Sequence, residues 1–96
     1  METLKASDKK KLKQISHGMQ PVIMLGKNGL TDALIKALKI ELENHEVVKV
    51  RFQKFQDEKN DMIEGLASMT ESTIIKIIGN VAVLYKKSSD PEKNIL

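Results

Sequence analysis

The sequence lacks several residues and patterns on which common kinds of site depend. Its 96 residues contain no cysteine, which excludes a disulfide framework, a thiolate zinc site and thiol catalysis. It has no tryptophan, and its aromatic residues are only Phe52, Phe55 and Tyr85. No apolar run approaches the roughly 18 residues that a membrane-spanning helix needs, and the N-terminal METLKASDKKKLKQ has no apolar signal core. We therefore expect a soluble, cytoplasmic protein without a membrane segment.

Acidic residues are scarce in the first part of the chain. The net charge is +3, and residues 1–40 hold eight lysines against three acidic residues, a balance of +5. Residues 41–96 hold eight basic and ten acidic residues, a balance of −2. This asymmetry favours a polyanionic partner, because each phosphate that a lysine neutralises releases counterions. On charge alone, a solvated basic face without a partner explains it equally well.

The hydrophobic pattern begins with a helix whose apolar seam is narrow. Ser7 is the expected N-cap, and Gly18 marks the end of the helix. The apolar side consists of Leu12, Ile15 and Met19. The remaining surface of this helix is wide and basic.

A strand and a second helix follow. The uninterrupted apolar run at 21–25 predicts a strand that is buried on both faces. Thr31 is the expected N-cap of the helix, and leucines spaced by four residues extend it to about Asn44. Leu30 and Ile35 are placed to form a hydrophobic staple at its start.

The second half contains a strand, a helix and a hairpin. Apolar and polar side chains alternate along residues 46–53, which predicts a strand with one covered face and one wetter, basic face. Lys49, Arg51 and Gln53 lie on the wetter face. A third helix is expected to bury Met62, Ile63, Leu66, Ala67 and Met69. Gly79-Asn80 separates two β-branched runs and predicts a two-residue hairpin turn. The last residues, 88–96, have lost periodicity and are expected to form a mobile tail.

This order predicts an α/β fold. Helices between strands imply right-handed parallel crossovers, and the hairpin adds an antiparallel strand. The expected architecture is a small two-layer sandwich of order α-β-α-β-α-β-β on a four-stranded mixed sheet. It forms a single domain over residues 1–87.

Residues suited to catalysis are few. The two histidines are joined to no HExxH, GxSxG or paired-carboxylate arrangement. His45 is expected to interact with the dipole at the end of the second helix. The carboxylates of Glu41, Glu43 and Glu46 are dispersed, and a solvated helix end explains them. We therefore predict a protein that is not an enzyme and that holds no metal or cofactor.

The stretch LGKNGLT at 25–31 carries the one motif with a mechanism. The glycines of GKNG let a ligand approach the backbone, and the loop opens onto a helix N-terminus whose N–H groups lack partners. A GXXG loop of this kind clamps the nucleic-acid backbone in KH modules. The spacing also suits an ordinary turn, because Asn-Gly is a favoured turn pair. The P-loop frame is absent, so nucleotide hydrolysis finds no support.

Longer segments resemble a known family. SHGMQPVIMLGKNGLTDALIKAL, ELENHEVVKVRF and IIGNVAVLYKK are similar, over roughly residues 7–87, to the YhbY-like family. This family is the stand-alone form of the CRM (chloroplast RNA splicing and ribosome maturation) RNA-binding domain. The resemblance implies a fold like the C-terminal domain of bacterial translation initiation factor three. The chain departs from the family pattern at Gln20, Asn80 and Lys86, where basic residues or arginine are common.

The resemblance implies non-catalytic binding of RNA. Its most specific implication is binding of ribosomal RNA, or of a precursor of the large ribosomal subunit during assembly. It places the basic first helix beside the glycine loop, and the binding surface would continue along the second helix. The predicted RNA-binding residues are Gly26, Lys27, Asn28, Gly29, Lys9, Lys10, Lys11, Lys13, His17, Lys36 and Lys39. Two alternatives stay open: a general nucleic-acid-binding protein that also takes DNA, and a protein-interaction module.

Overall fold

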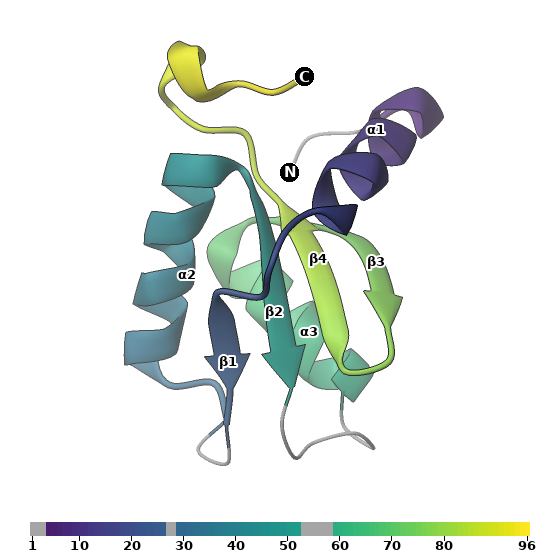
Figure 1. Cartoon of the computed structure of the whole chain (residues 1–96). Helices are drawn as coiled ribbons and strands as arrows, with labels where there is room; N and C mark the ends of the chain where they lie inside the picture. Colours follow the sequence, from purple (N-terminus) through teal and green to yellow (C-terminus); the bar gives the residue numbers. More distant parts are fainter. Residues whose placement is uncertain (1–3, 27–28, 53–58) are drawn as a thin grey trace.

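The chain folds around one mixed sheet flanked by helices (Figure 1). The computed structural model describes residues 4–26, 29–52 and 59–96. The predicted order of elements is confirmed, with a short 3-10 helix added near the C-terminus. The elements are α1 (Ala6–His17), β1 (Ile23–Leu25), α2 (Asp32–His45), β2 (Val47–Phe52), α3 (Lys59–Thr70), β3 (Thr73–Ile78), β4 (Val81–Tyr85) and η1 (Pro91–Lys93).

The sheet has the strand order β1-β2-β4-β3. Strand β1 runs parallel to β2, and the β3–β4 hairpin adds two antiparallel pairings, so the sheet is mixed as predicted. Gly79 makes the hairpin turn with a φ of +55°, a conformation that glycine adopts without strain. Strands β1 and β2 end at the same end of the sheet as this turn. There the Phe52 N–H donates to the Asn80 carbonyl at 2.7 Å.

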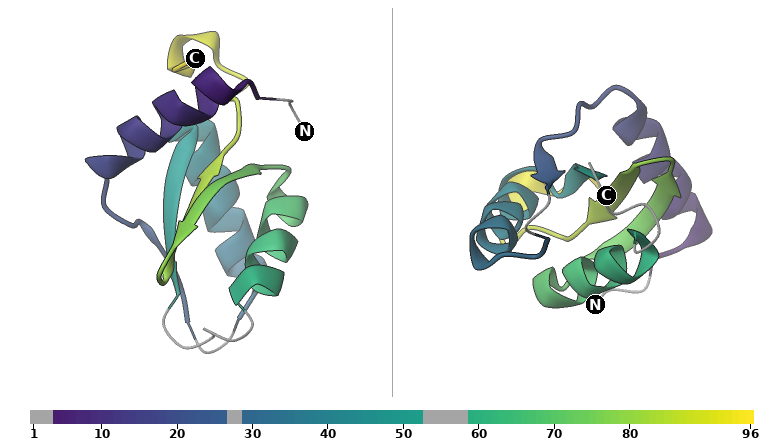
Figure 2. Two further views of the ribbon diagram at one scale, coloured as in Figure 1. Left: turned by 90° about the vertical axis from the view of Figure 1, so that its right-hand side faces the viewer. Right: turned by 90° about the horizontal axis from the view of Figure 1, so that it is seen from below.

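Helices cover the two faces of the sheet unequally (Figure 2). Helices α2 and α3 pack on one face over the larger core, which contains Leu38, Leu42, Val50, Phe52, Ile63, Leu66 and Leu84. Helix α1 lies on the opposite face at one end, where Leu12 packs with Val47, Ile75, Val83 and Tyr85. The two predicted layers are therefore the sheet and the α2–α3 pair, and α1 adds partial cover to the second face. None of the described helices is long and apolar enough to cross a membrane.

Strand β1 is not buried on both faces, which corrects the expectation from its apolar run. Ile23 and Leu25 point into the α2–α3 core, but the side chain of Met24 is 42% exposed on the other face. The strand lies at an edge of the sheet, and α1 crosses only the opposite end of this face. Strand β1 therefore has one buried face and one exposed face, although all of its residues are apolar.

Helix α1 differs from its prediction at the cap and along the seam. The N-cap is Lys5 instead of Ser7, and the Lys5 N–H donates to the Asp8 carboxylate at 3.3 Å. The buried positions are Leu12 and Ser16, whereas Ile15 is exposed. Ser16 can be buried because its hydroxyl donates to the Lys13 carbonyl at 2.7 Å, within its own helix.

Helix α2 begins as predicted, and α3 differs in one buried residue. The Thr31 hydroxyl accepts the Leu34 N–H at 3.1 Å, which confirms the cap. In α3 the expected buried Met69 is 51% exposed, and Thr70 is buried instead. The Thr70 hydroxyl donates to the Leu66 carbonyl at 2.8 Å, so its polarity is satisfied without water. A pattern based on apolar residues alone does not find such a position.

Glu46 corrects the prediction that the acidic end of α2 is solvated. Its side chain is fully buried, and its φ is +65° directly after the helix. The carboxylate accepts the Ser88 N–H at 2.6 Å, the Asn94 amide at 2.7 Å and the Ile95 N–H at 2.7 Å. These bonds fold the C-terminal segment back over the end of α2 (Figure 1).

Glu43 makes a second attachment for the same segment. Its carboxylate accepts the hydroxyls and one backbone N–H of Ser88 and Ser89. These hydrogen bonds, together with the nearby charge of Lys86, hold the pKa of the Glu43 carboxyl below its ordinary value. Residues 88–96, for which the sequence predicts a mobile tail, are thus tied to α2, and Ile95 packs beside Leu12 of α1. The mobility of residues 88–96 in solution stays a prediction.

Candidate nucleic-acid interface

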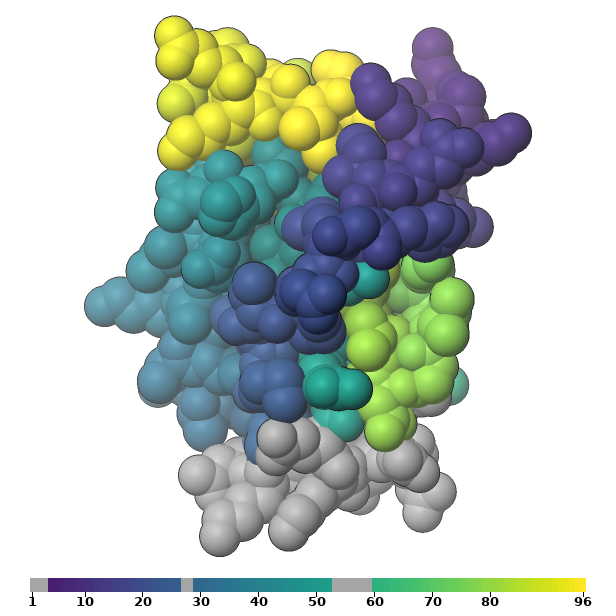
Figure 3. Space-filling view, in the orientation of Figure 1, coloured from purple at the N-terminus to yellow at the C-terminus, as the bar shows by residue number. Residues whose placement is uncertain are grey.

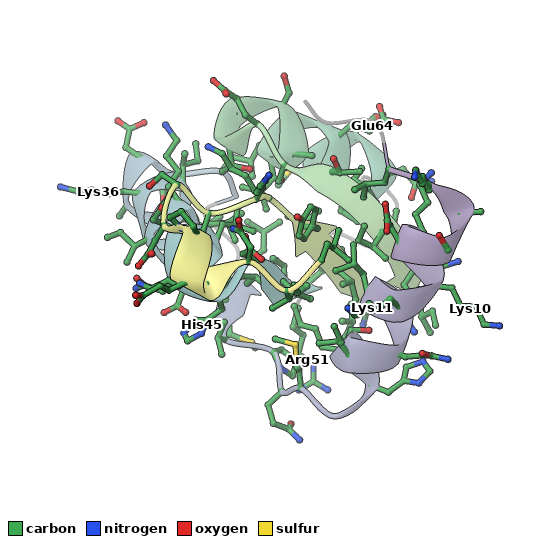
Figure 4. The ribbon with its side chains drawn as sticks, turned by 90° about the horizontal axis from the view of Figure 1, so that it is seen from above. Lys10, Lys11, Lys36, His45, Arg51 and Glu64 are labelled. Carbon is green, nitrogen blue, oxygen red and sulfur yellow. The ribbon has the colours of Figure 1, made fainter. Side chains whose placement is uncertain are left out.

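Helix α1 carries the densest group of cations in the described chain. The predicted binding residues on this helix are all exposed, namely Lys9, Lys10, Lys11, Lys13 and His17. None of their side chains makes a hydrogen bond or ion pair with another described residue. Lys10 points outward from the helix into solvent (Figure 4). Because no carboxylate of the described residues neutralises these cations, they are available for phosphate groups.

The two glycines of the GKNG motif are hydrogen-bonded to each other directly before α2. The Gly29 N–H donates to the Gly26 carbonyl at 3.1 Å, and the Thr31 N–H donates to the Gly29 carbonyl at 3.1 Å. Gly29 has a φ of +69°, and an added Cβ would lie 3.4 Å from the Met62 methyl group. Gly26 has no such φ and would place a Cβ in open space. The backbone conformation therefore favours glycine at 29, whereas the surroundings of residue 26 leave room for a Cβ.

Lys27 and Asn28 lie outside the described residues. Their predicted contacts with RNA remain predictions. The glycines on either side of them fix where the loop leaves β1 and enters α2.

The structure separates the first helix from the glycine loop, which corrects the expected adjacency. Helix α1 packs against Val47 at the start of β2, whereas Gly26 follows Leu25, the partner of Phe52 at the end of β2. Six residues of β2 span about 17 Å at the usual rise per residue. In Figure 1, α1 lies at one end of the sheet, and the end of β1, which leads to Gly26, lies at the other. One continuous patch from α1 to the loop must therefore include the sheet between them.

The two predicted lysines of α2 lie apart from α1. Lys36 and Lys39 are exposed, and α2 packs on the face of the sheet opposite to α1. Figure 4 shows Lys36 and Lys10 pointing outward on opposite flanks of the molecule. A single flat ligand does not contact both flanks, so the predicted residues divide into an α1 group and an α2 group.

Neither histidine belongs to a catalytic or metal-binding cluster in the described part of the chain. His45 lies 3.4 Å from the Glu41 carboxylate, one turn earlier on α2. His17 is exposed in the last turn of α1. Among the described histidines, aspartates and glutamates, no group of three is close enough to hold a metal ion.

Sequence reasoning missed part of the exposed sheet as a candidate surface. The alternation in β2 had placed Lys49 and Arg51 on a wetter face, and the structure confirms that Arg51 is exposed. Lys76 of β3 joins them on this face, because it pairs with Val83, which faces α1. The alternation in β2 predicted the positions of Lys49 and Arg51. The spacing of residues along the sequence does not predict the strand order that brings Lys76 to the same face.

The comparisons with known proteins match this arrangement to one family. The family model for the CRS1 / YhbY (CRM) domain matches residues 4–86, nearly the whole chain. The chain belongs to the CRS1 / YhbY (CRM) family. The resemblance found in the sequence segments is thereby confirmed.

Relatives of similar length support the assignment to the CRM family. The chain is 35% identical over 88 residues to probable RNA-binding protein YqeI of Bacillus subtilis, covering 91% of this chain and 92% of that protein. It is 31% identical over 93 residues to probable RNA-binding protein PA4753 of Pseudomonas aeruginosa, covering 96% and 89%. The solution structure of SAV1595 from Staphylococcus aureus, a hypothetical protein described as a candidate RNA binder, superposes with a TM-score of 0.78. It is 31% identical and covers 93% of this chain and 94% of that one.

Proposed function

We propose that this CRM protein binds RNA and catalyses no reaction. The observation that carries the proposal is the group of exposed lysines on α1, which have no acidic partner among the described residues. The relatives named as RNA-binding proteins, YqeI and PA4753, match along almost the full chain. No group of three described histidines and carboxylates is close enough to hold a metal ion.

We propose further that the RNA is ribosomal, and that the protein acts in the cytoplasm on a precursor of the large ribosomal subunit. The support is the resemblance to stand-alone members of the YhbY-like family. A small single domain with few aromatic side chains suits a folded RNA, whose backbone is held by phosphate and sugar contacts.

Charge reversal on two flanks tests the RNA-binding proposal. We expect Lys10→Glu with Lys13→Glu to weaken binding to a ribosomal RNA fragment and to reduce the dependence of log affinity on log salt by about 1.4 to 1.8. The charge-matched variant, Lys36→Glu with Lys39→Glu, tests the second group of predicted residues on α2, and it should leave most of the affinity in place if α1 carries the main contact. Equal losses from both pairs would show that affinity does not depend mainly on a binding surface on α1.

Competition and crosslinking separate the alternatives. Duplex DNA at matched salt should displace the RNA poorly; equal competition would indicate a general nucleic-acid binder. Crosslinking in cells followed by sequencing should recover ribosomal RNA. Capture of a protein partner that survives nuclease treatment, without recovered RNA, would favour a protein-interaction module.

A further inference from the structure

We propose that the open part of the sheet face beside α1 holds unpaired bases of the bound RNA. This inference rests on the proposed function and adds which part of an RNA is recognised. It assigns a role to residues that the family resemblance did not single out: Met24, Arg51, Val81 and Ile78.

These four side chains form one row across all the strands. In the parallel pairing Met24 of β1 is opposite Arg51 of β2, and in the antiparallel pairings Val81 of β4 is opposite both Arg51 and Ile78 of β3. Residues opposite each other in a sheet point to the same face. Neighbouring strands lie about 4.8 Å apart, so the row spans roughly 14 Å. Four-stranded RRM sheets hold about two or three bases on aromatic side chains, whereas this row has the guanidinium of Arg51 and aliphatic side chains in their place.

The row is left uncovered by the helices. Helix α1 covers the other end of this face, where Leu12 packs on Val47 and Val83. Beyond that contact, Met24 is 42% exposed, Ile78 is 62% exposed, and Arg51 is also exposed. In Figure 3 the surface below α1 is formed by β1, β2 and the β3–β4 hairpin side by side. Large apolar side chains on an open face mark a surface for another molecule.

The charge of this face selects the occupant. No acidic residue occurs in any of the four strands, whose sequences are IML, VVKVRF, TIIKII and VAVLY. The Lys49 ammonium is already used, because it donates to the Met19 carbonyl at 3.0 Å. The Arg51 guanidinium has no partner among the described residues and lies on the same side as α1, whereas Glu64 lies on the opposite side (Figure 4). The face is therefore cationic and apolar together.

An unpaired RNA segment matches both properties. Its bases have apolar faces that pack on aliphatic side chains and on the plane of a guanidinium, and its phosphates are anionic. A duplex hides its base faces and offers only its backbone to such a surface. The row starts at Met24, two residues before Gly26, and α1 covers the other end of the same face. An RNA strand that follows the row therefore lies beside the glycine loop, with α1 along its flank.

The test measures binding of the full chain to two RNAs. One is a single strand of about 12 nucleotides, within the range that one nucleic-acid-binding domain covers, and the other is the same strand annealed to its complement. We expect Ile78→Ser and Met24→Ser each to weaken binding of the single strand about fivefold. The salt dependence and the duplex affinity should not change, because no charge is altered.

Matched variants control for general effects of exposed apolar residues. Ile40→Ser on α2 and Met69→Ser on α3 replace side chains that are 53% and 51% exposed away from the row, and they should leave both affinities unchanged. Arg51→Lys keeps the charge but removes the flat guanidinium, so it should weaken the single strand more than the duplex. Circular dichroism and the urea midpoint establish that each variant is folded.

The outcomes separate this inference from the proposed function. If the wild-type protein binds neither RNA, the proposed function fails, and the inference fails with it. If the wild-type protein binds RNA but Ile78→Ser and Met24→Ser bind the single strand as tightly as it does, only the inference is overturned. That second result would assign the row to a protein partner.

Discussion

Glu46 is the residue whose replacement should most clearly disturb the fold away from the RNA-binding surface. Its buried carboxylate accepts hydrogen bonds from Ser88, Asn94 and Ile95. The Asn94 amide also reaches the carbonyls of Ser88 and Asp90, at 3.3 and 3.5 Å, whereas the backbone N–H groups of Ser88 and Ile95 have no second acceptor among the described residues. Replacing Glu46 by Gln keeps the size of the side chain and turns one accepting oxygen into an amide donor. Whichever way the amide is oriented, at least one N–H of the C-terminal segment then faces another donor.

The cost can be estimated from these contacts. A buried donor without an acceptor costs about 1–3 kcal/mol, and each remaining bond loses roughly 1 kcal/mol when its acceptor is no longer charged. The neutral amide also avoids the desolvation that the buried carboxylate suffers, which offsets part of this loss. We therefore expect Glu46→Gln to lower the free energy of unfolding by about 2 kcal/mol. The loss of unfolding free energy cannot exceed the cost of releasing residues 88–96 from α2, because this segment can detach while the sheet stays folded.

Urea denaturation and amide hydrogen exchange measure the two parts of this prediction. The midpoint should fall, and the amides of Ser88 and Ile95 should exchange much faster while those of β2 and β4 stay protected. Asn94→Ala is a matched perturbation, because its effect should shrink in the Glu46→Gln background if both act through the same contacts. A loss below about 0.5 kcal/mol with unchanged exchange at Ile95 would refute the reasoning, since that is the level of an ordinary surface substitution. It would also favour the prediction that residues 88–96 form a mobile tail.

Two further predictions concern the glycine loop and the fall of stability at acidic pH. Gly26→Ala should leave the urea midpoint unchanged and weaken RNA binding, and full RNA affinity in this variant would remove the loop from the binding surface. Gly29→Ala should lower the free energy of unfolding by about 1 kcal/mol or more, because the φ of +69° at this position strains alanine. The lowered pKa of Glu43 stabilises the fold above the pKa of the unfolded chain, and this contribution is lost as the pH falls through the folded value. Glu43→Gln should therefore flatten the fall in stability on acidification, measured by urea midpoints at several pH values, and an unchanged slope would contradict the assignment.

The order of elements could be predicted because local patterns determine it. Thr31 caps α2, and the Gly79-Asn80 turn closes the hairpin, both through interactions within a few residues. The two errors about which helix residues are buried have one shared cause. Ser16 and Thr70 are buried polar residues whose hydroxyls bond to their own helices, and they displace Ile15 and Met69 from the core. Hydrophobic periodicity counts side chains by polarity, and it does not register hydroxyls that are satisfied within the helix.

Long-range contacts account for what the sequence did not show. The burial of Glu46 depends on donors from residues 88–95, more than 40 positions away along the chain. Strand β1 reads as doubly buried because the sequence does not say that it forms an edge, or that α1 stops short of it. Both features follow from tertiary arrangement, and neither has a local signature.

The candidate site shows the same division between composition and arrangement. Composition predicted the basic side of α1, and the motif predicted the turn at Gly26, but their distance apart depends on the direction of β2. That separation has a functional consequence. A ligand that touches only α1 would make phosphate contacts without any reading of bases, and a ligand that touches only the loop would lack most of the cations. An RNA strand that follows the row around Arg51 lies between the two, so charge reversal on α1 should change the salt dependence while substitutions in the row change the preference for unpaired RNA. If both sets of variants altered the same quantity, the sheet would not be the connection between them.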